Sequence, residues 1–355
     1  SPPNGGFGEF YRNGFADRDM GALMAEADYA TYFVGKYHNN GFPIETGDIH
    51  YVPPGWDKFY GTLGNYYYGT AYTDNGRRGI IEPEKFRSDH EFDVAVEYVK
   101  SHKEGPFLLY FSPFNPHSSP GDSYPTRHVD LVSQAPRTEN FNEADVSDKV
   151  GGVDSLPLLD EDLVDRIHTN RVRSVAAIDD QIQRLLDVVP DNTYIFITSD
   201  NGFHTGEHRT LNKLLPYERV ISTPMIVSGP NVELGRLDAP MFANIDLLPT
   251  FLDIAGGVRP DFIDGRSFLT QINDLKEAPL RESILIESWI NFNVRGAIIP
   301  MEYSAVRTLN EIYIEWAHGP TEHYNLATDP WQLESTDEKR SDLLEAWKSC
   351  SGKNC

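Results

Sequence analysis

The chain has 355 residues, of which 39% are hydrophobic and 12% aromatic, and it carries a formal net charge of −23. This composition indicates a globular protein with a sizeable core, and no apolar run approaches the roughly 18 residues that a membrane span needs. The acidic charge excludes nucleic acid as a general partner, and an anionic substrate would need a local cluster of positive charge.

The first third of the chain predicts helices alternating with strands, from the 3.6-residue and compact apolar patterns respectively. The expected elements are a helix over Asp19–Ala27, a strand over Ala30–Val34, a hairpin at Asp74-Asn75-Gly76, a helix over Phe86–Ser101 and a strand over Phe107–Ser112. The segment from Ser118 to Leu159 is polar and rich in Pro, Gly and Asp, and we interpret it as a long loop or lid beside the site.

The alternation then resumes. The expected elements are a helix over Asp160–Val189, a strand over Thr193–Thr198, a helix near Lys213–Val220, a strand over Pro224–Val227 and a helix over Ile245–Ile254. After residue 280 the pattern changes to strands at Ser283–Glu287, Ala297–Ile299, Ser304–Thr308 and Ile312–Trp316, with a final helix over Ser341–Lys348. These patterns predict an α/β fold with a mostly parallel sheet sandwiched by helices over residues 1–280. A smaller antiparallel sheet plus helix is expected over residues 281–355.

The two cysteines, Cys350 and Cys355, lie close together near the C-terminus, with no histidine nearby. This context favours a small disulfide loop over a metal clip or two free thiols. A disulfide would in turn indicate an oxidising compartment, so we expect a secreted, periplasmic or lysosomal protein.

An Asp-Asn pair follows an apolar strand in the segment Thr198-Ser199-Asp200-Asn201-Gly202. Ligands bind beyond the carboxyl ends of parallel strands, and adjacent carboxylate and amide oxygens suit calcium or magnesium. The alternative is an ordinary turn at the end of the strand. His204 and His208 have the spacing of a zinc pair on a helix, but Gly202 and Gly206 make a helix there improbable, so a zinc pair is disfavoured.

Three more segments place positively chargeable side chains after strands or loops. Lys36 and His38 follow a strand that ends at Gly35, His117 follows a Pro-x-x-Pro turn, and Lys213 begins an expected helix. Each, taken alone, is an ordinary loop or surface residue. Together they would supply the positive charge that an anionic substrate requires, and His117 could act as a general acid.

In this order the segments resemble the type I, formylglycine-dependent sulfatase family over nearly the whole chain. The segments that carry the resemblance are Gly35-Lys36-Tyr37-His38, Pro113-Phe114-Asn115-Pro116-His117, Ser199-Asp200-Asn201-Gly202, Gly206-Glu207-His208, Pro216-Tyr217-Glu218 and Asn244-Ile245-Asp246-Leu247-Leu248-Pro249-Thr250. Pro53-Pro54-Gly55-Trp56-Asp57 and the tyrosines after it look most like the glucosamine-6-sulfatase, extracellular endosulfatase and fungal arylsulfatase branch.

The resemblance implies an alkaline-phosphatase-like fold and hydrolysis of sulfate esters, either of a sulfated glycan such as 6-sulfated glucosamine or of aryl sulfates. Asp200 and Asn201 would bind one calcium ion. Lys36 and His38 would hold the nucleophile and a sulfate oxygen. His117 and Lys213 would hold the sulfate and help to protonate the leaving oxygen. His204 is expected to contact the substrate, and the Cys350–Cys355 disulfide also fits the family.

One motif of the family is missing. Its nucleophile is a formylglycine made from the cysteine of a Cys-x-Pro-Ser-Arg motif, which these 355 residues lack. We therefore expect that an N-terminal segment of roughly a hundred residues, a size at the small end for a domain, is the partner of this chain. The 355 residues alone are expected to be inactive. The alternatives are a related phosphodiesterase with two zinc ions, and a catalytically inactive protein of the same fold that binds sulfated glycans.

Overall fold

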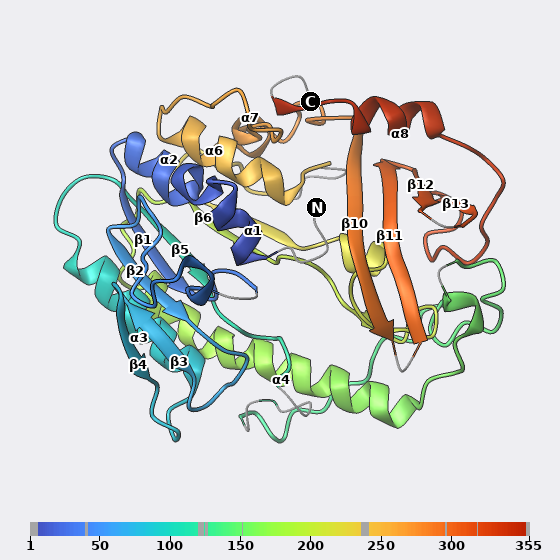
Figure 1. Cartoon of the computed structure of the whole chain (residues 1–355), viewed down its shortest axis with the longest axis horizontal. Coiled ribbons are helices and arrows are strands. Elements are labelled where there is room, and N and C mark those ends of the chain that lie inside the picture. The colour runs from blue at the N-terminus through green and yellow to red at the C-terminus, as the bar shows by residue number, and fades with distance from the viewer. Residues whose placement is uncertain are drawn as a thin grey trace. The chain divides into compact units, whose positions relative to one another are not determined.

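The computed structural model describes residues 6–39, 42–119, 124, 127–150, 152–235, 241–294, 297–317 and 319–352 (Figure 1). The chain forms two compact units, each assembled from separate segments. The first unit comprises Ser1–Gln134, Arg166–Asp191 and Ile254–Val258, and the second comprises Ala135–Asp165, Asn192–Asp253 and Arg259–Cys355.

The first unit contains a five-stranded sheet and most of the long helix α4. Its helices are α1 (Phe7–Arg12), α2 (Met20–Glu26), α3 (Arg87–Ser101) and α4 (Glu161–Leu186), which begins in the second unit, with 3-10 turns η1 (Phe15–Arg18) and η2 (Ile44–Thr46). Its strands are β1 (Ala30–Gly35), β2 (Lys58–Thr62), β3 (Ala71–Asp74), β4 (Arg77–Ile80) and β5 (Phe107–Ser112).

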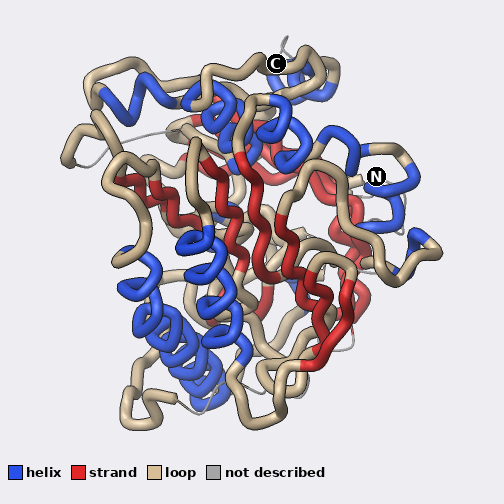
Figure 2. The backbone as a smooth tube through the Cα atoms, turned by 90° about the vertical axis from the view of Figure 1, so that its left-hand side faces the viewer, coloured by secondary structure: helices blue, strands red, loops and turns tan. Residues whose placement is uncertain are grey.

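The strand order is β4-β3-β2-β1-β5, with β2, β1 and β5 parallel and β3 and β4 antiparallel at one edge. Because successive side chains of a strand point to opposite faces, the apolar run of β1 buries residues on both faces of the sheet. One face packs Tyr32 and Val34 against Ala95 and Tyr98 of α3, whereas the other packs Phe33 against Trp56 and Phe59. Figure 2 shows the strands in red and the helices in blue.

The second unit contains a four-stranded antiparallel sheet and two strand pairs. Its strands are β6 (Ile195–Thr198), β7 (His204–Thr205), β8 (Leu211–Asn212), β9 (Met225–Ser228), β10 (Ser283–Val294), β11 (Ala297–Thr308), β12 (Glu311–Trp316) and β13 (Thr321–Asn325). Its helices and 3-10 turns are η3 (Val153–Ser155), α5 (Glu218–Ile221), η4 (Asn244–Asp246), α6 (Leu247–Ile254), α7 (Leu269–Asn273) and α8 (Ser341–Lys348).

The β10-β11-β12-β13 sheet separates two apolar clusters. On one face Tyr303, Ile314 and Trp316 join a cluster that also contains Leu215 and Tyr217. On the other face a second cluster includes Leu344 of α8. Helix α8 therefore packs on the C-terminal sheet, and this agrees with the predicted fold class, a small antiparallel sheet plus one helix.

The predicted α/β architecture is confirmed, with parallel strands at the centre of a helix-covered sheet and a smaller antiparallel C-terminal sheet carrying one helix. Four expected elements differ most in extent. The strand expected at Ser283–Glu287 continues to Val294 as β10. The helix expected near Lys213–Val220 is only Glu218–Ile221, and the strands expected at Ala297–Ile299 and Ser304–Thr308 are one continuous strand, β11. Pairing along the whole length of β10 keeps β11 continuous.

Within the described residues no helix combines the length and apolarity required to cross a bilayer. Cys355 lies outside the described residues, so the Cys350–Cys355 disulfide stays a prediction.

Candidate active-site residues at the ends of strands

Strands β1 and β5 end at the same level of the first unit's sheet. They are parallel neighbours, and their last residues, Gly35 and Ser112, lie opposite each other. Gly35 has φ +117°, and a Cβ there would lie 2.0 Å from the Ser112 carbonyl oxygen, so only glycine fits. The segments that carry Lys36, His38 and His117 therefore leave the same carboxyl edge of the sheet, where α/β folds bind their ligands.

His38 lies among aromatic rings. Its imidazole centroid is 4.4 Å from that of Phe10 and 4.6 Å from that of Tyr37. Burial in these surroundings lowers the pKa of His38 to about 4. The imidazole is thus neutral at neutral pH in this structure, and it would become a cation only if a bound anion raised its pKa.

His117 is held by a turn whose backbone is fixed from several sides. Its backbone N–H donates to the Phe114 carbonyl (3.0 Å), and its carbonyl accepts from Tyr67 Oη (2.6 Å). The side chain of Asn115, in the same turn, donates to the Ser174 carbonyl (2.8 Å) on α4. His117 Nδ1 lies 2.8 Å from the Ser118 carbonyl, which can only accept, so Nδ1 carries a proton and acid–base chemistry would use Nε2.

Asp200 and Asn201 lie just beyond β6 in the second unit. The Asn201 N–H donates to Asp200 Oδ1 (2.9 Å), and Lys213 Nζ donates to Asn201 Oδ1 (3.0 Å). Asp200 is exposed and forms no ion pair with another described residue, so its charge is open to a cation. Carboxylate and carboxamide oxygens are hard donors, and this pair therefore fits calcium.

The loop after Asn201 buries both of its histidines. His204 is 1% exposed and His208 is fully buried, and burial is the largest cause lowering the pKa of each. His204 Nδ1 lies 2.5 Å from Thr210 Oγ1, whereas Nε2 has no hydrogen-bond partner among the described residues. His204 is thus buried among the described residues, and its expected contact with a substrate stays a prediction. The two histidines do not lie on a helix, which agrees with the argument against a zinc pair.

The described part of the segment from residue 135 to 159 is hydrogen-bonded to this loop, which no local pattern in the sequence predicted. Arg209 donates to the carbonyls of Glu143 (2.7 Å), Ala144 (2.6 Å) and Leu156 (2.8 Å). Glu143 Oε2 lies 2.6 Å from His208 Nδ1 in the interior. The described residues of this segment are thus fixed to the loop by hydrogen bonds, whereas the sequence suggested a loop or lid.

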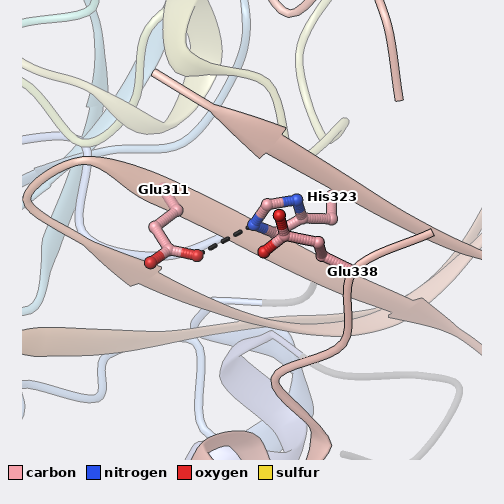
Figure 3. Close-up of side chains that lie close together, drawn as sticks. All are labelled: Glu311, His323 and Glu338. Atoms are coloured by element: carbon pink, nitrogen blue, oxygen red, sulfur yellow. Dashed lines mark hydrogen bonds and ion pairs between the residues drawn. The ribbon is translucent and has the colours of Figure 1, made fainter. Parts of the chain in front are cut away.

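One cluster elsewhere has the composition of a metal site. The possible ligand atoms of Glu311, His323 and Glu338 all lie within 4.8 Å of one another (Figure 3). However, Arg340 Nη2 lies 2.6 Å from Glu311 and 3.0 Å from Glu338, so a guanidinium already neutralises both carboxylates. We interpret the cluster as an ion-pair network of the C-terminal sheet.

Asn244 is a further residue beside the candidate site. Its segment carries part of the family resemblance, but sequence reasoning assigned Asn244 no role in the site. Its side-chain amide donates to the carbonyls of Ser199 (3.1 Å) and Asp200 (3.3 Å). Asn244 lies more than forty positions from Asp200 in the chain, so no local pattern could have paired the two residues.

Comparison with known proteins agrees with these features. Residues 13–258 match the family described as Sulfatase, and residues 206–346 match the family described as N-sulphoglucosamine sulphohydrolase, C-terminal. The N-acetylglucosamine-6-sulfatase of Capra hircus is 29% identical over 393 aligned residues, covering 94% of this chain and 68% of that protein. The extracellular sulfatase SULF-1 homolog of Drosophila melanogaster is 28% identical, covering 76% of this chain and 26% of that protein.

The fold also matches solved structures. A protein solved in complex with its substrate D-glucosamine-2-N,6-O-disulfate superposes with a TM-score of 0.67 at 20% identity, covering 93% of this chain and 79% of that chain. Since the match to the sulfatase family covers more than half of the chain, from before α2 to beyond α6, this protein belongs to the sulfatase family of sulfuric ester hydrolases.

Proposed function

We propose that the protein hydrolyses a sulfate ester on a sugar, with a 6-sulfated glucosamine residue of a glycan as the leading candidate and small aryl sulfates as accessible substrates. The observation that carries this proposal is the contact of Lys213 with Asn201, next to the Asp200 carboxylate, which has no ion-pair partner among the described residues. The Lys213 ammonium lies next to two side-chain oxygens that could bind a divalent metal ion. A sulfate group could then be held between the ammonium and the metal ion. The glucosamine preference is supported by the similarity to N-acetylglucosamine-6-sulfatase.

In this proposal Asp200 and Asn201 contribute two ligands to one calcium ion. Bound calcium would withdraw charge from the sulfate oxygens and so assist cleavage of the ester. Lys213 already donates to the Asn201 carboxamide oxygen, which leaves the second lone pair of that oxygen for the metal. Lys213 would thereby fix the orientation of Asn201 and present its remaining N–H donors to the sulfate.

Lys36, His38 and His117 would act from the carboxyl edge of the first unit's sheet. Lys36 and His38 would bind the nucleophile and a sulfate oxygen, and an anion beside His38 would raise its lowered pKa. His117 Nε2 would donate a proton to the leaving sugar oxygen, because Nδ1 is engaged with the Ser118 carbonyl. Proton donation matters most when the leaving group is a poor one.

The nucleophile itself would come from outside these 355 residues. They contain no Cys-x-Pro-Ser-Arg motif, and the curated relative extends well beyond the aligned part of this chain. We therefore propose that a preceding segment supplies a formylglycine and the remaining calcium ligands. Peptide mapping of the full-length protein tests this: a Cys-x-Pro-Ser-Arg peptide with the mass of the aldehyde supports it, and a mature protein that begins at Ser1 with nothing associated refutes it.

The function is tested with the full-length protein and its His117→Ala variant on two substrates. If His117 protonates the leaving group, turnover of a glucosamine 6-sulfate should fall by about 100-fold or more, whereas turnover of nitrophenyl sulfate should fall far less. Lys100→Ala, a change of an exposed residue at the end of α3, serves as the control. Equal losses on both substrates would remove the acid role from His117.

Metal content separates the proposal from the phosphodiesterase alternative. The asparagine at position 201 favours calcium, whereas a two-zinc site would favour histidine there. One calcium ion per protein is expected, and two zinc ions would refute the assignment. Binding of sulfated glycan without any turnover of either substrate would instead support the inactive, glycan-binding alternative.

The location that we propose is outside the cytosol, in a secreted, periplasmic or lysosomal compartment. The similarity to an extracellular sulfatase supports it, as does the disulfide predicted between Cys350 and Cys355. Mass spectrometry of the non-reduced protein, with and without alkylation, tests the disulfide, because two alkylated thiols would contradict it.

A further inference from the structure

The peptide groups on both sides of Asp200 are held by one side chain. Asn244 Nδ2 lies 3.1 Å from the Ser199 carbonyl oxygen and 3.3 Å from the Asp200 carbonyl oxygen. These carbonyls belong to the peptide planes before and after the Asp200 Cα. The orientation of the two planes sets φ and ψ of Asp200, and therefore the direction in which its carboxylate leaves the backbone.

Asn244 itself sits on a rigid base. It is the first residue of η4, which ends at Asp246, a fully buried carboxylate. Asp246 accepts hydrogen bonds from the backbone N–H groups of Ala243 and Arg266 (both 2.8 Å) and from two nitrogens of Arg281 (2.9 and 2.6 Å). A carboxylate satisfied by charge-assisted bonds on several sides holds its turn in one conformation.

The turn also has no room to move outward. A Cβ on Gly265 would lie 1.9 Å from the Ile245 carbonyl oxygen, so the backbone of the following loop passes directly against η4. A shift of Asn244 away from Asp200 would require that loop to move as well. The amide of Asn244 is thus presented to the end of β6 by a tightly packed turn.

Asn201 is held by different groups. Lys213 contacts its side chain (3.0 Å), and Ser199 Oγ donates to its carbonyl (2.9 Å). Loss of the Asn244 amide would therefore remove the side-chain contact shared by the two peptide planes of Asp200, while the Asn201 contacts and the Asn201 N–H bond to Asp200 Oδ1 would stay in place. This separation makes the contribution of Asn244 measurable by itself.

We propose that Asn244 is a positioning residue that orients the Asp200 carboxylate toward the calcium ion without contacting the ion itself. The inference rests on the proposed function, in which Asp200 is a calcium ligand. Residues that orient metal ligands by hydrogen bonds typically contribute 10- to 100-fold to metal affinity. Because Asn244 is exposed, water can replace its amide as a donor, so little overall stability depends on it.

The test measures calcium binding to the chelator-treated, full-length protein by titration calorimetry, comparing wild type with Asn244→Ala. The calcium Kd should rise by about 10-fold, and the melting temperature of the metal-free protein should stay within about 2 °C. Asn310→Ala is the matched control, because Asn310 is also exposed and lies in the turn between β11 and β12. Its calcium Kd should equal that of the wild type.

The outcomes separate the two levels of the proposal. A wild-type protein that binds no calcium refutes the metal site of the proposed function. Wild-type binding with an unchanged Kd in Asn244→Ala overturns the positioning role alone, as does an equal rise of Kd in Asn310→Ala. A lower melting temperature of Asn244→Ala without a change in Kd would show a purely structural residue, and would likewise overturn the inference.

Discussion

Replacing Glu143 by glutamine is expected to change how the stability of the protein depends on pH. Glu143 Oε2 lies 2.6 Å from His208 Nδ1, and the two side chains are 6% and 0% exposed. Burial raises the pKa of Glu143 from 4.5 to about 7, and burial followed by the charge of Lys149 lowers the pKa of His208 from 6.5 to about 3. Between pH values of about 3 and about 7, the folded pair therefore holds one proton, and this proton lies on Glu143.

The sign of the effect follows from proton counting. Between pH 4.5 and 6.5 the unfolded chain carries one proton on His208 and the folded chain carries one on Glu143, so the contributions of the two groups cancel. Taken alone, the raised pKa of Glu143 stabilises the fold fully below pH 4.5, and this contribution is lost as the pH rises to about 7. Glutamine cannot release a proton, so the stability of the variant does not fall in this way as the pH rises.

The magnitude comes from the width of this window. One proton over about 2.5 pH units, at about 1.4 kcal/mol per unit, corresponds to about 3 kcal/mol. The unfolding free energy of Glu143→Gln relative to wild type should therefore increase by up to about 3 kcal/mol between pH 4.5 and 7. Urea unfolding at four pH values measures it, with the exposed Glu139→Gln as control. A difference that stays flat or decreases with pH would show that Glu143 is ionised in the folded protein.

Two other substitutions test the packing around the site loop. Asp148→Asn removes the closest ionised partner of the Lys149 ammonium, whose side chain is fully buried. Urea unfolding at pH 8 should show that the free energy of unfolding falls by about 3 kcal/mol. A fall of less than about 1 kcal/mol would mean that water reaches the ammonium. Gly202→Ala places a Cβ 2.1 Å from a backbone carbonyl oxygen, so thermal unfolding should show a loss of about 1–3 kcal/mol, and an unchanged melting temperature would contradict the close approach.

The strands that carry the candidate site could be predicted because residues that end a strand stand on both sides of each apolar run. β1, β5 and β6 are apolar runs bounded by glycine, proline or Asp-Asn, and each lies within two residues of its expected position. β2 was missed, because Lys58–Thr62 is short and contains Gly61, which weakens a strand pattern. It forms as a strand because β1 pairs with it along four positions.

The polar residues at the strand ends were predicted from local motifs, whereas the residues that hold them were not. Asn244 and Glu143 each lie tens of positions from the residue that they contact, and no local pattern links either residue to its partner. Burial also changed the expected chemistry, since a histidine such as His38 looks like a cation in the sequence and is neutral among aromatic rings. Such contacts depend on tertiary packing, which periodicity does not encode.

The buried pairing of Asp246 with Arg281 has a consequence at the level of the gene. Arg281 stands where the C-terminal strands begin, whereas Asp246 supports the turn beside β6. A premature stop codon after position 280 would remove the guanidinium along with β10 to β13, and would leave the Asp246 carboxylate without its ionic partner. Such an allele is expected to give an unfolded and degraded product, so the C-terminal sheet is not a part that evolution could discard or exchange independently.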